Sequence, residues 1–287
     1  MDRLIAFLTA PIPRPLLWVL VPTAALALVT IFVFLRFPFG EFAPTLARQL
    51  SQSTGGEVLI GDIEPQWTIG GPGMAARDVR VVMPDRTRID VDPLTIRPAW
   101  STSWLGGDPA FKLTALSTLG EVEGTLELGD TPAWRGDFTE IDLALLPLPP
   151  TEGFAIEGLL TGEADLSLGA DGIRGPLHFE AVAGRLDHSA LPVGIEFDQI
   201  RGDLFLGGLQ NVEIQSLEFA GPIIEASGKG TILSQSPEQE PSLDLEVEIE
   251  IKNPPLRAML EGMGLPLGGQ GSSRFSIQGT PSQPRLQ

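Results

Sequence analysis

The chain contains no cysteine, and only two of its 287 residues are histidines. Without cysteine the protein has no disulfide framework, no thiolate metal ligand and no thiol nucleophile. His178 and His188 have an even separation, so on a regular strand they would share a face. No third ligand is suggested by the neighbouring residues, and we therefore expect solvated histidines, no metal site and no cofactor.

Basic residues are also scarce, since 19 lysines and arginines stand against 37 acidic residues and give a formal net charge of −18. Residues 1–36 hold three arginines and one aspartate, so residues 37–287 carry a net charge of −20. Such a chain repels the phosphates of nucleic acid at long range, which argues against nucleic acid as a partner. We interpret the charge as a source of solubility for a surface outside the cytoplasm.

The usual sequence motifs of catalysis are missing as well. No Gly-x-Ser-x-Gly segment is present, and the segment 228–231 places its lysine before glycine, unlike a phosphate-binding loop. The sequence thus predicts a protein that is not an enzyme and has no catalytic residue. The alternative, an enzyme that uses His178 or a pair of carboxylates, requires a pocket that gathers those side chains.

What the chain does have is one long apolar run, the 20 uncharged residues from Leu16 to Leu35. A helix of that length rises about 30 Å, the thickness of the hydrocarbon core of a bilayer. Ala25-Leu26-Ala27 has the form of a signal-peptidase site, but the apolar run continues past it, whereas a cleaved signal ends there. We predict an uncleaved transmembrane helix over 16–35 and a cytoplasmic tail over 1–15. The acidic remainder is expected on the far side, because an anionic cytoplasmic leaflet would repel it.

After the anchor the sequence reads as a long succession of β-strands. Short β-branched segments alternate with glycine and proline, and segments of the form Gly-x-Leu recur without a fixed period. Two short helices are expected, one over Pro44–Ser53 and one over Leu256–Met263, from their proline and glycine boundaries and apolar spacing. The proline-rich stretch 146–150 suggests a division into halves at 36–150 and 151–287.

The clearest strand runs from Leu243 to Ile251. Its even-numbered positions are all acidic between 244 and 250, and the odd-numbered positions are all apolar. Because strand side chains point alternately to opposite faces, one face is anionic and must meet water. The other face must meet a core, a second sheet or lipid, as expected in an antiparallel sheet with one covered face. The candidate partner or lipid face consists of Leu243, Leu245, Val247, Ile249 and Ile251.

Four stretches of the sequence carry a resemblance to a known family. They are the anchor with Phe37-Pro38-Phe39 and the strand Gly56–Ile60, the segment Gly73–Val81, the segment Gly120–Leu126, and the tail Phe275–Pro281 followed by Pro284. In this order they resemble the type II secretion system protein N family, in its delta-proteobacterial form, and more distantly the AsmA-like proteins. The proline-rich stretch 146–150 departs from the family pattern. The family has no established catalytic residues, so the resemblance assigns no site.

The resemblance implies an elongated, curved antiparallel sheet in the periplasm, held at the bacterial inner membrane by a single-pass anchor. It also implies a component of the type II secretion machinery that acts through contacts with other secretion-system subunits rather than through chemistry. AsmA-like relatives are thought to form curved sheets whose apolar trough can carry lipid. The alternative is therefore an envelope protein that binds or transfers phospholipid, and the apolar face of 243–251 is compatible with a trough or with a filled core.

Overall fold

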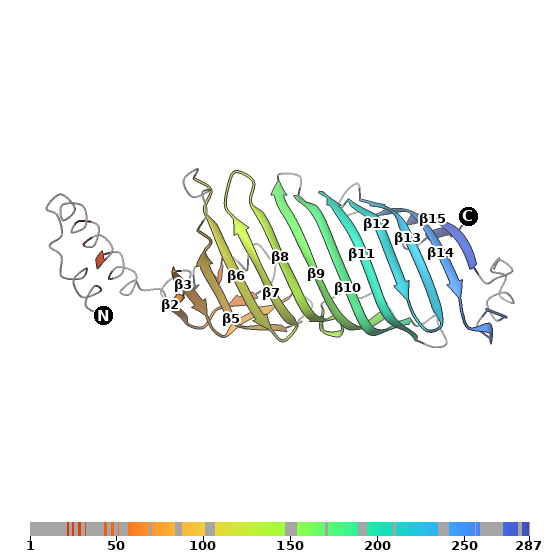
Figure 1. Ribbon diagram of the computed structural model, residues 1–287, viewed down its shortest axis with the longest axis horizontal. Helices are drawn as coiled ribbons and strands as arrows, with labels where there is room; N and C mark the ends of the chain where they lie inside the picture. Colours follow the sequence, from red (N-terminus) through yellow and green to blue (C-terminus); the bar gives the residue numbers. More distant parts are fainter. Residues whose placement is uncertain are drawn as a thin grey trace, which may run out of the picture.

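The computed structural model describes most of the chain from residue 57 onward. The described residues are ten single positions between 22 and 51 and the ranges 57–68, 71–83, 88–100, 107–146, 154–169, 172–188, 194–208, 211–234, 241–255, 257–258, 272–280 and 283–286. Within them the protein is mainly β, and its strands form one antiparallel sheet of 16 strands (Figure 1). This confirms the mainly β class predicted from the sequence.

The sheet is built from strands of very different lengths, and β9, β10 and β11 at its centre are the longest. In chain order the strands are β1 (Glu57–Leu59), β2 (Ile63–Thr68), β3 (Gly71–Ala76), β4 (Val79–Val82), β5 (Arg88–Pro98), β6 (Ala110–Ser117), β7 (Gly120–Glu127), β8 (Ala133–Asp142), β9 (Phe154–Gly169), β10 (Gly172–His188), β11 (Ile195–Gly207), β12 (Val212–Ala220), β13 (Ile224–Leu233), β14 (Ser242–Ile251), β15 (Ser272–Thr280) and β16 (Gln283–Leu286). A turn of 3-10 helix, η1 (Leu143–Leu145), stands between β8 and β9.

From β4 onward each strand pairs with the next one along the chain, so the sheet is an up-and-down meander that ends at β16. β5 pairs with β4 through its first half and with β3 through its second half, and β2 joins through β3. Figure 1 shows the strands side by side along the long axis, with β2 and β3 at the N-terminal end. β8 also pairs with β9, so the sheet is continuous across residue 150. The division into halves there remains a prediction.

Glycines lie opposite large side chains on neighbouring strands. Phe138 pairs with Gly162, and Phe179 pairs with Gly202. A Cβ added at Gly162 would overlap the Phe138 ring and the carbonyl oxygen of His178, and one at Gly202 would overlap the Phe179 ring. Each ring therefore lies over the glycine of the next strand, and this packing favours one register of the strands.

The register of the sheet shifts at several pairings, and two of these β-bulges lie around Glu140 in β8 and around Ala183 in β10. Their backbones are left-handed there, with φ of 54° at Glu140 and 50° at Ala183. A bulge bends its strand and increases the local twist. It also breaks the alternation of side chains along the strand. The bulge around Ala183 lies between positions 178 and 188, so the even separation that predicts a shared face on a regular strand does not apply to them.

A small core covers one side of the sheet near the bulges. η1 begins after Asp142, whose Oδ1 accepts a hydrogen bond of 3.0 Å from the amide of Ala144. The turn brings Leu143 against Ala181 and Phe197, which are only 1% and 2% exposed. Partly buried side chains surround these three residues, namely Leu146, Ile156, Leu160, Ile200 and Phe219.

The predicted membrane span over 16–35 lies outside the described residues except at Pro22, Ala25, Leu28, Val29 and Phe32, which are helical. Among the residues that the structure describes, no helix is long and apolar enough to cross a membrane.

The two predicted short helices are described only in part. In the first, Pro44, Ala47, Arg48 and Ser51 are helical, and the Ser51 hydroxyl donates to the carbonyl of Ala47 at 2.8 Å. At the second, the described residues 254–255 and 257–258 are helical, and the amide of 257 donates to the carbonyl of 253 at 3.0 Å. The apolar residues that predicted it, Leu256, Met259, Leu260 and Met263, lie outside the described part of the chain.

The glycine packing predicts opposite effects of one substitution at two positions. Gly162→Ala forces the Phe138 ring and a backbone carbonyl to move, and we expect it to destabilise the fold by about 1–3 kcal/mol. At Gly228 an added Cβ would make only ordinary van der Waals contacts, the nearest at 3.4 Å from the carbonyl oxygen of Glu246. Gly228→Ala should therefore be neutral or stabilising by up to about 1 kcal/mol. Denaturant unfolding of both variants measures the difference, and equal effects would contradict the packing.

Candidate functional site

The sheet has one continuous apolar face. Residues paired directly across an antiparallel ladder point to the same side, so the register identifies which side chains share this face. Three adjacent rows of apolar residues and glycines run across the strands. They are Leu160, Ala181, Ile200, Phe219, Ala226 and Ile249; Phe138, Gly162, Phe179, Gly202, Leu217, Gly228, Val247 and Phe275; and Gly136, Ala164, Leu177, Leu204, Ile214, Gly230, Leu245 and Ile277. We call these rows the apolar face.

Most large side chains of the apolar face are only partly buried. Leu177, Leu204, Leu217 and Val247 all keep intermediate exposure. The contrast is with Phe197, which η1 and its neighbours leave 2% exposed. Every described strand belongs to the same sheet. Among the described residues, η1 thus covers one margin of the apolar face, and the central rows stay partly exposed.

The five residues predicted as a partner or lipid face lie on β14 as the alternation indicated. Leu243, Leu245, Val247 and Ile249 are partly exposed, while their acidic neighbours are exposed on the other side. Ile251, at the end of the strand, is only 2% exposed and is therefore part of the packed interior. Four of the five residues are accessible to a ligand. That they bind one stays a prediction.

Cross-strand cations offset the charge on the acidic side of β14. Nζ of Lys229 on β13 lies 3.3 Å from Oε2 of Glu246, and the guanidinium of Arg274 on β15 donates to Glu248 at 2.8 Å. The hydrogen bond from Arg274 lowers the pKa of the Glu248 carboxyl below its usual value. The repulsion expected between the four carboxylates is therefore reduced by both neighbouring strands.

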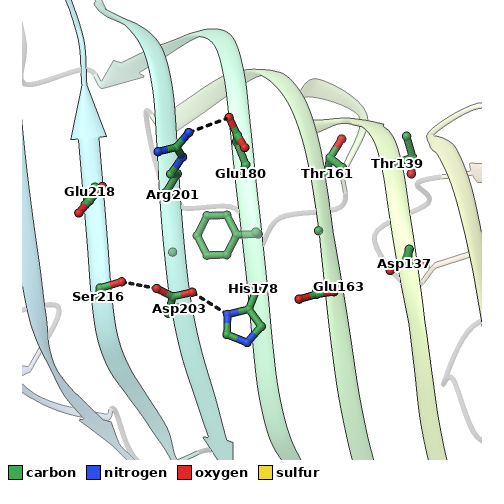
Figure 2. Close-up of a pocket in the computed structure, with 13 residues that line it drawn as sticks. Asp137, Thr139, Thr161, Glu163, His178, Glu180, Arg201, Asp203, Ser216 and Glu218 are labelled. Atoms are coloured by element: carbon green, nitrogen blue, oxygen red, sulfur yellow. Dashed lines mark hydrogen bonds and ion pairs between the residues drawn. The ribbon is translucent and has the colours of Figure 1, made fainter.

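The opposite, polar face carries a shallow cavity of about 630 Å³ over β8 to β12 (Figure 2). At its centre Oδ1 of Asp203 lies 2.6 Å from Nδ1 of His178, and the hydroxyl of Ser216 donates to Oδ2 at 2.6 Å. Arg201 forms an ion pair with Glu180 at 3.8 Å beside them. The hydrogen bond from Ser216, followed by that from His178, lowers the pKa of Asp203.

This polar cluster brings together residues that the sequence placed far apart, and it meets the condition that an enzyme would need a pocket with His178 and several acids. Its geometry does not activate a nucleophile, because the Ser216 hydroxyl donates to Asp203 rather than to the imidazole. The side chains of His178 and Asp203 are 46% and 50% exposed, so the cluster is well solvated. Within the described residues no group of three or more His, Asp or Glu side chains is arranged to hold a metal ion.

Sequence reasoning missed this cluster because its members lie on β10, β11 and β12, and only the register joins them. His178 pairs directly with Asp203, and Asp203 pairs with Ser216. In the sequence, each of these strands has a polar residue at every second position. This pattern predicts a solvated face, but it does not predict which polar side chains pair across neighbouring strands. The prediction of solvated histidines is met at His178, which keeps a partly exposed side chain.

No protein-family model matches the chain, and neither a curated protein nor a solved structure matches it. The resemblance to the type II secretion system protein N family and to AsmA-like proteins therefore stays a prediction.

The lowered pKa of Asp203 predicts a pH-dependent contribution to stability. A carboxyl with a lower pKa in the folded state stabilises the fold above its unfolded pKa, and this contribution is lost as the pH falls through the folded pKa. We expect Asp203→Asn to lower the melting temperature at neutral pH and to have little effect in strong acid. Ser216→Ala, which removes the larger cause, should raise the Asp203 pKa measured by NMR titration. An unchanged pKa in that variant would contradict the assigned hydrogen bond.

Proposed function

We propose that this protein acts in the bacterial envelope as a membrane-anchored binding protein, and that its apolar face binds the acyl chains of phospholipid. The observation that carries the proposal is the continuity of the partly exposed apolar rows from β8 to β15. Large contiguous apolar surfaces are rare on soluble proteins and mark sites for a partner or ligand. An elongated, curved sheet of the AsmA-like kind would enclose such a ligand along its length.

The dimensions of the apolar face fit lipid tails. Neighbouring strands lie about 4.8 Å apart, so the eight strands from β8 to β15 span about 34 Å. One leaflet contributes about 15 Å to the hydrocarbon core of a bilayer. The rows are therefore long enough for two acyl chains laid end to end across the strands, while the charged side chains of the opposite face remain in water.

A second candidate function is a role as an assembly component of the type II secretion system at the inner membrane. The order of the four family-like stretches favours it, as does the uncharged run Leu16–Leu35 that precedes the sheet. In this case the apolar face would contact another secretion-system subunit. Both candidates need an anchored, periplasmic sheet that acts by binding, and they differ in what covers the apolar face.

Site-specific photocrosslinking separates the two candidates. Val247 and Glu246 are adjacent on β14 but lie on opposite faces, so a photoreactive amino acid at each gives a matched pair. In cells that express the full chain, we expect the probe at Val247 to form a lipid adduct detected by mass spectrometry and the probe at Glu246 to form none. A Val247 crosslink to a protein would favour the secretion candidate, and equal lipid labelling at both positions would contradict a binding face.

The secretion candidate predicts a phenotype of its own. Deletion of the gene should lower the amount of type II substrates in the medium and retain them in the periplasm. Glu246→Gln, on the solvated face, should restore secretion, whereas Val247→Asp should not, because a charge cannot be buried against an apolar partner at low cost. Immunoblots of medium and periplasm measure both, with membrane levels of each variant as the control. Normal secretion in the deletion strain would exclude this role.

A further inference from the structure

The charge of the chain is strongly asymmetric along its length. Residues 57–112, which hold β1 to β5 and the start of β6, contain eight acidic and six basic residues, so their formal net charge is only −2. Residues 113–287 contain 27 acidic and nine basic residues, which gives −18. An anionic membrane surface attracts basic segments and repels acidic ones within about one Debye length, roughly 8–10 Å. Only the N-terminal end of the sheet can therefore approach such a surface without a large electrostatic cost.

The same end of the sheet exposes two tryptophans. Trp67 on β2 is 52% exposed, and Trp100, just after β5, is 63% exposed. Trp67 pairs with Pro72 across the β2–β3 hairpin. A Cβ added at the adjacent Gly71 would lie 3.1 Å from the indole nitrogen of Trp100, so this ring lies against the start of β3. Two residues 33 positions apart in the sequence thus flank one corner of the sheet, which we call the tryptophan corner.

Tryptophan is the side chain best suited to the boundary between membrane and water. Its ring is apolar, its N–H needs a polar partner, and it is accordingly enriched at the headgroup level of membrane proteins. In soluble proteins it is highly buried on average. An exposure above one half at both Trp67 and Trp100 therefore fits an interfacial surface better than a solvated one.

The expected anchor keeps this corner close to a bilayer. The apolar run ends at Leu35 and β1 begins at Glu57, so 21 residues join them. Fully extended, this connection spans at most about 75 Å, and helical residues rise only about 1.5 Å each. Ala47, Arg48 and Ser51 within it are helical. In Figure 1, β2 and β3 stand at the N-terminal end of the sheet and β14 near its other end.

We propose that the tryptophan corner docks into the headgroup region of the membrane that holds the anchor. Trp67 and Trp100 enter the interface, and the acidic strands from β7 onward project away from the surface. The apolar face, which begins at β8, then extends away from the membrane, so that the docked corner sets the orientation of the sheet. This docking rests on the membrane anchor of the proposed function.

Fluorescence quenching by lipid tests the docking with the full chain in vesicles of phosphatidylethanolamine and phosphatidylglycerol that carry brominated acyl chains. Each protein keeps one tryptophan, at position 18, 67 or 100, and has phenylalanine at the others. The matched control is Phe205→Trp without other tryptophans, because Phe205 is 38% exposed on the polar face of β11, away from both the corner and the apolar face. We expect brominated lipid to quench Trp18, Trp67 and Trp100 several-fold more than the control.

The outcomes separate docking from anchoring. Strong quenching of Trp18 with Trp67 and Trp100 at the level of the control would overturn the docking and leave the anchor intact. Absent quenching of Trp18 would overturn the anchor and the docking together. Trp134 packs over Gly124 and Gly136, so its replacement can perturb the fold. A second set of variants therefore retains Trp134 and subtracts its emission, and Trp67 and Trp100 must again be quenched.

Discussion

The register of the antiparallel ladder is the constraint on which the rest of this structure depends. A shift of one residue in any pairing would move every side chain of that strand to the other face. The rings of Phe138 and Phe179, which lie over Gly162 and Gly202, make such a shift costly because a displaced ring would meet a side chain instead of a glycine. Each strand from β4 onward pairs with the next. A hairpin whose register is fixed therefore also fixes the register of the strands beside it, and the apolar face stays continuous.

How much could be predicted depended on whether a property belongs to one strand or to several. The alternation from Leu243 to Ile251 fixed both faces of β14, since strand geometry alone determines them. The contact between His178 and Asp203 could not be predicted, because a separation of 25 residues contains no information about pairing. The bulge around Ala183 could not be predicted either, since no sequence pattern indicates an alanine with a left-handed backbone. Alternation could not say which residues of the apolar face of β14 belong to a core, and Ile251, at the end of the strand, lies in the packed interior.

Electrostatics explains how so acidic a sheet remains folded. On the solvated face, cations on one strand lie opposite acids on the next, as in the pairs Arg135–Asp165 and Arg274–Glu248. Exposed pairs of this kind each contribute little to stability, about 0–1 kcal/mol. Their larger effect is to remove the local repulsion between acids on adjacent strands. The excess of acidic over basic residues then acts at longer range, and its negative charge repels anionic surfaces from the solvated face.

The two kinds of apolar residue in this sheet distinguish a filled core from a binding surface. Where the protein supplies its own cover, as η1 does for Ala181 and Phe197, exposure falls to 1% and 2%. Where no described residue covers them, Val247 and Leu217 keep intermediate exposure although strands flank them on both sides. A sandwich would bury both groups alike, because its second sheet covers the whole face. The difference is consistent with the proposed occupant from outside the sheet, and acyl chains would meet its two requirements, to be apolar and to extend across the strands.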